Sequence, residues 1–225
     1  MKISGFDKLT LLNYPDKVAC TIFTSGCNLR CPFCHNSGLV TNNYNEISFD
    51  SIYEYLKKRI GILDGVCITG GEPLIHADIK DYIKKIKDLG YLVKIDTNGC
   101  NPKLLKELID LKLVDYIAMD IKNIYSKYDI TSGVKVNIDN IKKSISIIEN
   151  SGIDYEFRTT IVKEFHNTQD IKEILSYISS NSNYYIQNFK NSNDVFNRNL
   201  SSFSENELVE MKNEINNKNI YFRDL

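Results

Sequence analysis

The sequence predicts an α/β fold in which strands and helices alternate to form an open partial (β/α)6 barrel. Three observations indicate it: short runs of branched and aromatic residues, apolar residues at helical spacing between them, and six such runs before the last helix. Strands that alternate with helices pair in parallel through crossover connections. Six strands are too few for a closed eight-stranded barrel. We expect a single domain over residues 1–225.

The strands are placed by their runs of branched and aromatic residues, which begin after a polar turn at Asn13–Asp16. They are expected at Val18–Phe23, Gly65–Thr69, Tyr91–Asp96, Tyr116–Asp120, Tyr155–Val162 and Tyr184–Phe189.

The helices between these strands have recognisable ends. Ser48 is a suitable cap for the first, Gly90 ends the second, and Pro102 takes the first position of the third. Later helices are indicated by apolar residues three and four positions apart, and the last spans about Glu205–Asn216. A short tail at Ile220–Phe222 closes the chain.

Composition excludes several classes of protein. Charged residues make up 25% of the chain, and the formal net charge is -1, so no bulk attraction to nucleic acid or to a membrane is expected. No apolar run is long enough to cross a bilayer, and the N-terminus has no signal-peptide pattern, which predicts a cytoplasmic protein. Cys20, Cys67 and Cys100 are scattered singly and are expected to be unpaired thiols, the first two buried.

Three other cysteines, Cys27, Cys31 and Cys34, follow the first strand in a C-x3-C-x2-C spacing. Three thiolates from one loop suit a metal centre better than a disulfide, which needs pairs. A structural zinc ion needs four ligands, and a [4Fe–4S] cluster is usually held by four cysteines. A cluster held by three leaves one iron open to another ligand. The alternatives are a zinc site completed by His35, which adjoins Cys34 too closely, and three packing cysteines.

Polar residues also follow the later strands. Because parallel strands end at the same edge of a barrel, these residues are expected to share one rim with the cysteine loop. They are Gly70-Gly71-Glu72-Pro73, Asp96-Thr97-Asn98-Gly99, Asp120-Ile121-Lys122 and Arg158.

Each group on the rim has a functional and a purely structural interpretation. Gly70 and Gly71 either form a tight turn or let the backbone approach a ligand, and Glu72 could then accept a hydrogen bond from an amine of that ligand. Asp96 and Asp120 are either solvent-exposed helix caps or two neighbouring carboxylates, which repel each other unless a cation lies between them.

Lys122 and Arg158 are the basic residues expected on the rim, and each could simply be a surface charge. Arg158 lies within a strand, however, and needs a carboxylate partner, from a ligand or from an aspartate. His76 and His166 show no partner pattern and are expected to be surface or loop residues.

The cysteine motif resembles that of the radical S-adenosylmethionine (SAM) enzymes, C-x3-C-x-aromatic-C. The resemblance implies that Cys27, Cys31 and Cys34 ligate a [4Fe–4S] cluster and that Phe33 lies along the adenine of SAM. It implies that SAM chelates the open iron and is cleaved to methionine and a 5′-deoxyadenosyl radical. It also implies that the Gly70-Gly71-Glu72 segment meets the methionyl amine.

Within that superfamily the chain resembles the glycyl-radical-enzyme activases. Their pattern is matched by Thr10–Pro15, by Cys34-His35-Asn36, and by the segments after the third and fourth strands. The resemblance implies a possible monovalent cation held by Asp96, Thr97, Asp120 and the carbonyl of Ala118. It further implies SAM contacts by His35, Lys122 and Gln187, with Arg158 beside the SAM carboxylate.

The chain looks most like the activating proteins of anaerobic ribonucleoside-triphosphate reductase, close to the pyruvate formate-lyase activating enzymes. The implied reaction is removal of a hydrogen atom from one glycine of the partner, with flavodoxin or ferredoxin as electron donor. Two alternatives stay open. One is a small-molecule enzyme similar to 7-carboxy-7-deazaguanine synthase, and the other is a non-catalytic iron–sulfur or zinc-binding regulatory module.

Overall fold

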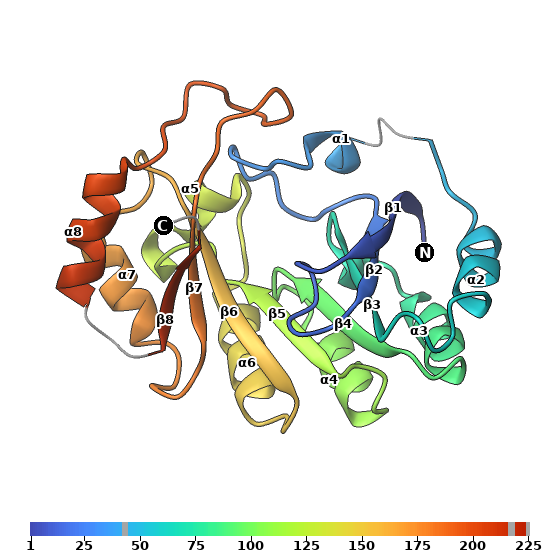
Figure 1. Cartoon of the computed structure of the whole chain (residues 1–225). Coiled ribbons are helices and arrows are strands. Elements are labelled where there is room, and N and C mark those ends of the chain that lie inside the picture. Colours follow the sequence, from blue (N-terminus) through green and yellow to red (C-terminus); the bar gives the residue numbers. More distant parts are fainter. Residues whose placement is uncertain (42–44, 216–218, 224–225) are drawn as a thin grey trace.

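The computed structural model of the chain describes residues 1–41, 45–215 and 219–223 (Figure 1). Its strands form one sheet of eight in sequence order. All neighbours pair in parallel except β1 and β2, which pair antiparallel. The strands are β1 (Ile3–Thr10), β2 (Ala19–Thr24), β3 (Gly65–Gly70), β4 (Leu92–Thr97), β5 (Tyr116–Asp120), β6 (Asp154–Ile161), β7 (Tyr184–Asn188) and β8 (Ile220–Arg223).

Helices lie along the outer face of this sheet, from α2 and α3 beside the first strands to α7 and α8 beside the last (Figure 1). They are α2 (Phe49–Lys57), α3 (Ile79–Asp88), α4 (Pro102–Asp110), α6 (Ile138–Glu149), α7 (Thr168–Leu175) and α8 (Glu205–Ile215). Two short helices, α1 (Ser37–Val40) and α5 (Tyr128–Ser132), belong to the segments that follow β2 and β5. Two 3-10 turns, Pro73–Ile75 and Tyr125–Lys127, complete the set. In the described residues no helix is both long and apolar enough to cross a membrane.

The predicted partial barrel is confirmed, and its six expected strands are β2 to β7. The flanking strands were not expected. β1 alternates only weakly and pairs with β2, with Phe6 opposite Ile22. The tail extends β7 in parallel as β8. Pairing ends at β1 and at β8, so across the described residues the sheet stays open.

The predicted helix ends are also found. The Ser48 side chain accepts a hydrogen bond from the backbone of Asp50, Gly90 follows α3 with a positive φ of 88°, and Pro102 opens α4. The expected last residue of the final helix, Asn216, lies outside the described residues.

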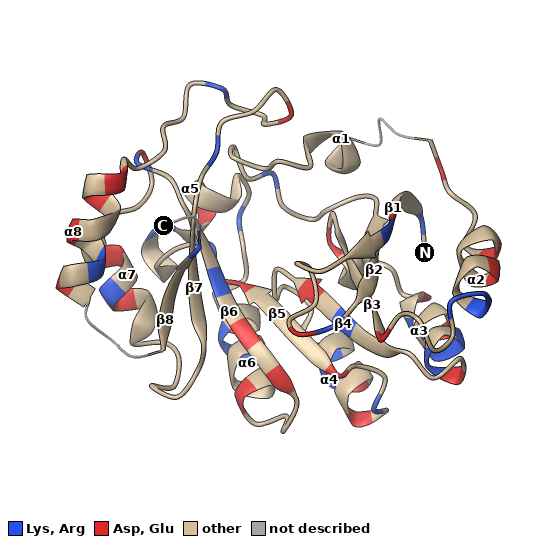
Figure 2. Cartoon of the chain, in the orientation of Figure 1, with Lys and Arg blue, Asp and Glu red and all other residues tan. Residues whose placement is uncertain are grey.

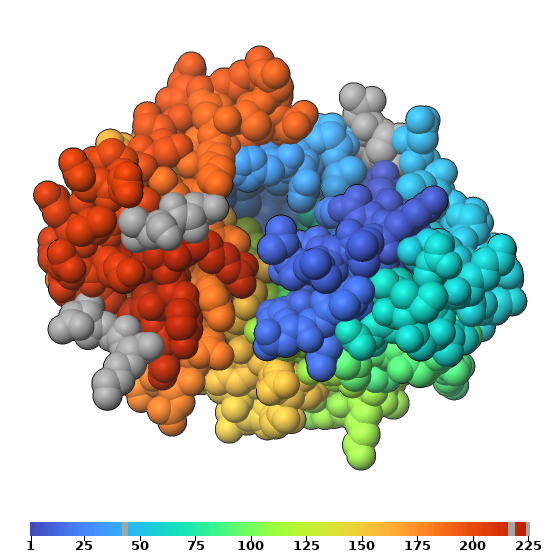
Figure 3. All heavy atoms as spheres, in the orientation of Figure 1, coloured from blue at the N-terminus to red at the C-terminus, as the bar shows by residue number. Residues whose placement is uncertain are grey.

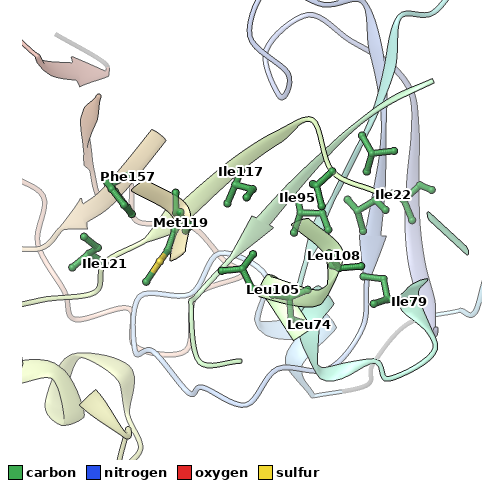
Figure 4. Packing of buried hydrophobic residues seen from close by; sticks show 14 of the residues in the cluster. Ile22, Leu74, Ile79, Ile95, Leu105, Leu108, Ile117, Met119, Ile121 and Phe157 are labelled. Carbon is green, nitrogen blue, oxygen red and sulfur yellow. The ribbon is translucent and has the colours of Figure 1, made fainter. Parts of the chain in front are cut away.

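The hydrophobic core lies between the sheet and the helices. Figure 4 shows Leu105 and Leu108 of α4 beside Ile22, Ile95 and Ile117 of the strands, all of them fully buried. Side chains alternate between the two faces of a strand, so these apolar residues leave the opposite face for other side chains. That inner face carries the polar residues of the site.

Candidate active site

Every predicted site residue except Ala118, whose carbonyl was expected at the cation site, lines one cavity of about 250 Å³ at the carboxyl ends of the strands. The cavity receives residues from the cysteine loop after β2, from the loops after β3, β4 and β5, and from the strands β6 and β7. The predicted residues are Cys27, Cys31, Phe33, Cys34, His35, Gly70, Gly71, Glu72, Asp96, Thr97, Asp120, Lys122, Arg158 and Gln187. The sequence argument did not assign roles to its other polar lining residues, Asn36, Thr69, Asn98 and Thr160.

The cysteine loop is braced by the end of α5. The backbone amide of Arg30 donates to the carbonyl of Ser132 over 2.8 Å. Gly133 has a positive φ of 69°, and a Cβ there would lie 2.1 Å from the carbonyl oxygen of Arg30. Glycine is therefore required for this close approach, which fixes the loop between its first two cysteines.

The segment after β7, residues 189–203, packs against the same loop from another side. The backbone amide of Asn197 donates to the carbonyl of Pro32 over 2.9 Å. A second buried apolar cluster joins the two segments through Leu29, Cys31, Phe33, Val162, Phe189, Val195 and Leu200. In Figure 1 this segment is the orange loop that reaches toward α1, and in Figure 3 orange atoms lie next to the light-blue atoms of the chain after β2. The cysteine loop is thus held from both sides by protein.

Burial controls the protonation of the three cysteines. It raises the pKa of Cys27 to about 12 and raises the pKa values of Cys31 and Cys34 above their ordinary value. Cys27 is also approached by two N–H donors: the backbone amide of Leu29 at 3.4 Å and the Asn98 side chain at 3.9 Å. Hydrogen bonds to sulfur of this kind stabilise a thiolate ligand.

The donor set was tested against a single ion and against a cluster. In residues 1–41, 45–215 and 219–223, no three His, Cys, Asp or Glu side chains are grouped to hold one metal ion. The three thiols of the cysteine loop all line the cavity, and three cysteines from one loop fit an iron–sulfur cluster.

Gly70 and Gly71 allow the loop after β3 to press against the start of the cysteine loop. A Cβ on Gly71 would lie 1.9 Å from the carbonyl oxygen of Gly26, and one on Gly70 would lie 2.6 Å from the backbone of Thr24. Backbone amides of Gly71 and Glu72 donate to Thr24 and Gly26, each over 2.9 Å. The two glycines line the cavity as predicted, but the close approach they permit is between two backbones.

Glu72 is buried and connects the loop after β3 to the end of β4. Its Oε1 accepts from the Thr97 hydroxyl at 2.7 Å and from the Leu74 amide at 3.1 Å, and its Oε2 accepts from the Asn98 amide at 2.7 Å. Burial raises the pKa of Glu72 to about 7 although these hydrogen bonds oppose the shift. A nearby cation would therefore stabilise its ionised form strongly.

Asp96 and Asp120 are bridged by the guanidinium of Arg158. Its Nε lies 2.8 Å from Asp120 Oδ1, and its Nη1 lies 3.3 Å from Asp96 Oδ2. Each aspartate has a second cation, Lys94 at Asp96 and Lys122 at Asp120. Burial opposes ionisation, but these cations outweigh it and hold the pKa values of both aspartates below their ordinary range. Arg158 thus has the carboxylate partners that its position in a strand predicted.

The residues of the expected cation site are partnered differently from the expectation. Thr97 donates to Glu72, and Arg158 already balances the repulsion between Asp96 and Asp120. A monovalent cation at this place stays a prediction.

The histidines differ in their surroundings. His35 lines the cavity, and its ring centre lies 5.5 Å from that of Phe189, while its contact with SAM stays a prediction. His166 lies in a loop, as expected, but it is only 4% exposed and its Nε2 lies 2.9 Å from the carbonyl of Lys122, a partner that the sequence did not indicate. The loop after β6 folds beneath the loop after β5, and no local sequence pattern encodes that contact.

Asn36 and Asn98 are two of the four polar lining residues that had no predicted role. The Asn36 side chain donates to the carbonyl of Gly70 over 3.2 Å, and that of Asn98 donates to Asn28 over 2.8 Å. Both lie inside motifs that the sequence analysis quoted, so their position in the motifs was the available signal.

Three thiols on one loop beside charged groups at the carboxyl rim of an open partial barrel are suited to a class of enzyme that holds a metal cluster and a charged cofactor. The sequence profile of the Radical SAM superfamily matches residues 21–178. The chain belongs to the radical SAM superfamily, whose members use a [4Fe–4S] cluster and SAM.

Two known proteins that are similar to this chain are named as activating enzymes. The chain is 32% identical, over 93% of its length and 89% of the relative's, to a Methanocaldococcus jannaschii protein named "Putative glycyl-radical enzyme activating enzyme". It is 33% identical to the pyruvate formate-lyase-activating enzyme of Listeria monocytogenes over 46% of each chain.

A solved structure supports the fold. The chain resembles Streptococcus suis SuiB bound to its precursor peptide SuiA, with a TM-score of 0.70, 18% identity, and coverage of 90% of this chain and 48% of SuiB. The chain therefore spans about half of SuiB.

Proposed function

We propose that this chain activates a glycyl radical enzyme, and that the partner is an anaerobic ribonucleoside-triphosphate reductase. The reaction removes an α-hydrogen from one glycine of the partner and leaves a glycyl radical there. The cluster and SAM supply this radical chemistry, and an electron from flavodoxin or ferredoxin initiates it. One observation carries the proposal: the Cys34-His35-Asn36 motif and the aspartates at the ends of β4 and β5, which resemble those of activating enzymes, line a single cavity in a chain that aligns with such a relative over 93% of its length.

The cavity offers complementary charge for the methionyl part of SAM. Glu72 is suited to accept the ammonium, because an adjacent cation would relieve the cost of its buried charge. The ion-paired groups around Arg158, some lining the cavity and some below it, comprise four cations and three carboxylates, which leaves one positive charge for the SAM carboxylate. The cations are Lys94, Lys122, Arg158 and Arg223, and the carboxylates are Asp96, Asp120 and Glu156.

Apolar and polar walls would hold the rest of the cofactor. We assign Phe33 to the adenine, because it is buried, lines the cavity and is fixed by the cluster with Phe189 and Leu200. Gln187 reaches the cavity from β7 and is suited to contact the adenosyl part. Correct placement of the cofactor next to the cluster is the main contribution that these side chains can make.

The experiment is anaerobic reconstitution with iron and sulfide, followed by reduction and EPR with and without SAM. The reduced cluster signal should change when SAM is added. Addition of the reductase should then give a glycyl radical doublet, and a reductase with its radical glycine replaced by alanine should give none. Production of 5′-deoxyadenosine only in the presence of a pterin would contradict the proposal and favour the deazaguanine synthase alternative.

The electron donor requires a separate comparison. Reduced flavodoxin and reduced ferredoxin are each supplied in place of dithionite, and the yield of 5′-deoxyadenosine is measured. Turnover with dithionite but with neither protein would contradict that part of the proposal alone.

A further inference from the structure

A layer of charged and aromatic residues lies below the cavity, on the inner face of the strands. It consists of Lys94, Tyr116, Glu156 and Arg223, which we call the lower layer. None of these residues lines the cavity. Lys94 and Glu156 lie two positions before Asp96 and Arg158 on β4 and β6, so each pair shares the inner face of its strand. Figure 2 shows acidic and basic residues together along these two strands, in the middle of the sheet.

The lower layer is connected internally by polar contacts. The Tyr116 hydroxyl donates to Glu156 Oε2 over 3.2 Å, and the ammonium of Lys94 lies 5.8 Å from the centre of the Tyr116 ring. Arg223 Nη2 lies 3.0 Å and 3.1 Å from the two Glu156 oxygens. Glu156 is therefore anchored from β5 and from β8 at once.

Two contacts connect this layer to the cavity wall above it. Lys94 forms an ion pair with Asp96 Oδ1, while Asp96 Oδ2 receives Arg158 and the Thr69 hydroxyl. Glu156 Oε1 lies 3.7 Å from Arg158 Nη1, the nitrogen that also faces Asp96. Lys94 thus occupies one carboxylate oxygen of Asp96, and Glu156 supports the guanidinium from below.

Stability alone is a weak reason for such a layer. The side chains of Lys94 and Glu156 are 2% and 1% exposed, and the desolvation of buried charges offsets much of their attraction. A well-packed apolar layer would stabilise a barrel interior as well. Polar partners behind functional groups instead fix the orientation of those groups.

We propose that Lys94 and Glu156 are positioning residues for SAM: Lys94 orients Asp96, and Glu156, held by Arg223 and Tyr116, orients Arg158. The inference rests on the proposed use of the cavity for SAM. It assigns to residues outside the cavity the task of keeping Asp96, Asp120 and Arg158 in one arrangement before the cofactor arrives. A preorganised wall binds its ligand without the cost of ordering side chains.

The test uses the reconstituted holoenzyme and the variants Lys94→Met and Glu156→Gln. The SAM dissociation constant is read from the EPR change of the reduced cluster, and kcat and KM from 5′-deoxyadenosine formation. We expect a dissociation constant and a KM for SAM raised about tenfold or more, with iron content unchanged. The matched control is Lys87→Met. It removes an ion pair in which Lys87 Nζ lies 2.6 Å from Asp115 Oδ2, and neither residue lines the cavity. This variant should bind SAM as the wild type does.

A double-mutant cycle separates orientation of Asp96 from general packing. If Lys94 acts through Asp96, Lys94→Met should have little further effect on SAM affinity in an Asp96→Asn background. Additive losses of affinity would overturn the assignment for Lys94.

The remaining outcomes are also decisive. Variants that fold, carry a full cluster and bind SAM within twofold of the wild type would overturn the inference and leave the proposed function intact. Failure of both variants to fold would give the layer a purely structural role and also overturn it. A wild-type cluster that ignores SAM would refute the proposed function itself.

Discussion

The backbone amide of Asn98 donates to Glu72 Oε2 over 2.7 Å, and the side chain of the same asparagine reaches the cysteine loop at Asn28. One residue therefore links the loop after β4 to the loop after β3 and to the loop after β2. The three loops are therefore connected, and a substitution that displaces one of them is expected to displace the others.

Replacement of Cys27, Cys31 or Cys34 by alanine should abolish cluster assembly and SAM cleavage, because the loop offers three thiols and each is expected to hold one iron. Iron and sulfide content after reconstitution, with 5′-deoxyadenosine production, measures the effect. Cys20→Ala is the control, since Cys20 is fully buried within β2 and does not line the cavity. It should lose some stability and keep the cluster.

Gly71→Ala should displace the cysteine loop, because the new Cβ would meet the Gly26 carbonyl at 1.9 Å. We expect the free energy of unfolding to fall by about 1–3 kcal/mol and iron incorporation to fall with it. Denaturant unfolding and iron content test this. Gly61→Ala is the control. A Cβ at position 61 would have no atom within 4 Å, so only the positive φ of 79° disfavours alanine there, and the iron content should stay normal.

The buried carboxylate of Glu72 should make the cluster-free protein less stable as the pH rises from about 5 to 8. Its pKa is raised from 4.5 to about 7, so the folded state binds the proton more tightly than the unfolded state. The stability is therefore full below the unfolded pKa and falls as the pH passes through the folded pKa, by up to about 3 kcal/mol. Urea unfolding across this range gives the slope.

The control for this pH dependence is Glu72→Gln, which cannot ionise. At pH 5 the variant should be less stable than the wild type, because its amide NH2 cannot accept one of the hydrogen bonds that the two carboxyl oxygens of Glu72 receive. Its stability should also depend much less on pH. An unchanged slope in the variant would assign the pH dependence to other groups.

Arg158→Met should destabilise the protein by about 3–5 kcal/mol, because it leaves Asp96 and Asp120 close together without their shared cation. The same variant should lose SAM binding. Lys106→Met removes an exposed ion pair with Asp110 on α4 and should change stability by less than about 0.5 kcal/mol. Equal effects of the two changes on unfolding would contradict the bridging role of Arg158.

Much of the site could be predicted from the sequence because of one geometric rule. Parallel strands end at the same edge, so residues that follow β2, β3, β4 and β5 had to share a rim. Asp120 and Arg158, which are register partners on β5 and β6, show how directly this rule brings side chains together. The six central strands were predictable for a similar reason, since each is a short apolar run.

The pairings between side chains were not predictable in the same way. Thr97 hydrogen-bonds Glu72 rather than joining the aspartates, and Lys94 and Glu156 passed unnoticed although each is a charge inside a strand. Such contacts depend on which rotamers fit a crowded interior, and local patterns carry no information about that. The weakly patterned β1 and β8 were missed because they are edge strands with little apolar alternation.

The contact between Asn197 and Pro32 also has a consequence for the order of events in the cell. The cysteine loop leaves the ribosome early, but its cover in residues 189–203 is made only when most of the chain has been synthesised. Until then the loop lacks the apolar neighbours that complete its packing. A chain that ends before residue 189 would therefore expose the three cysteines without these apolar neighbours.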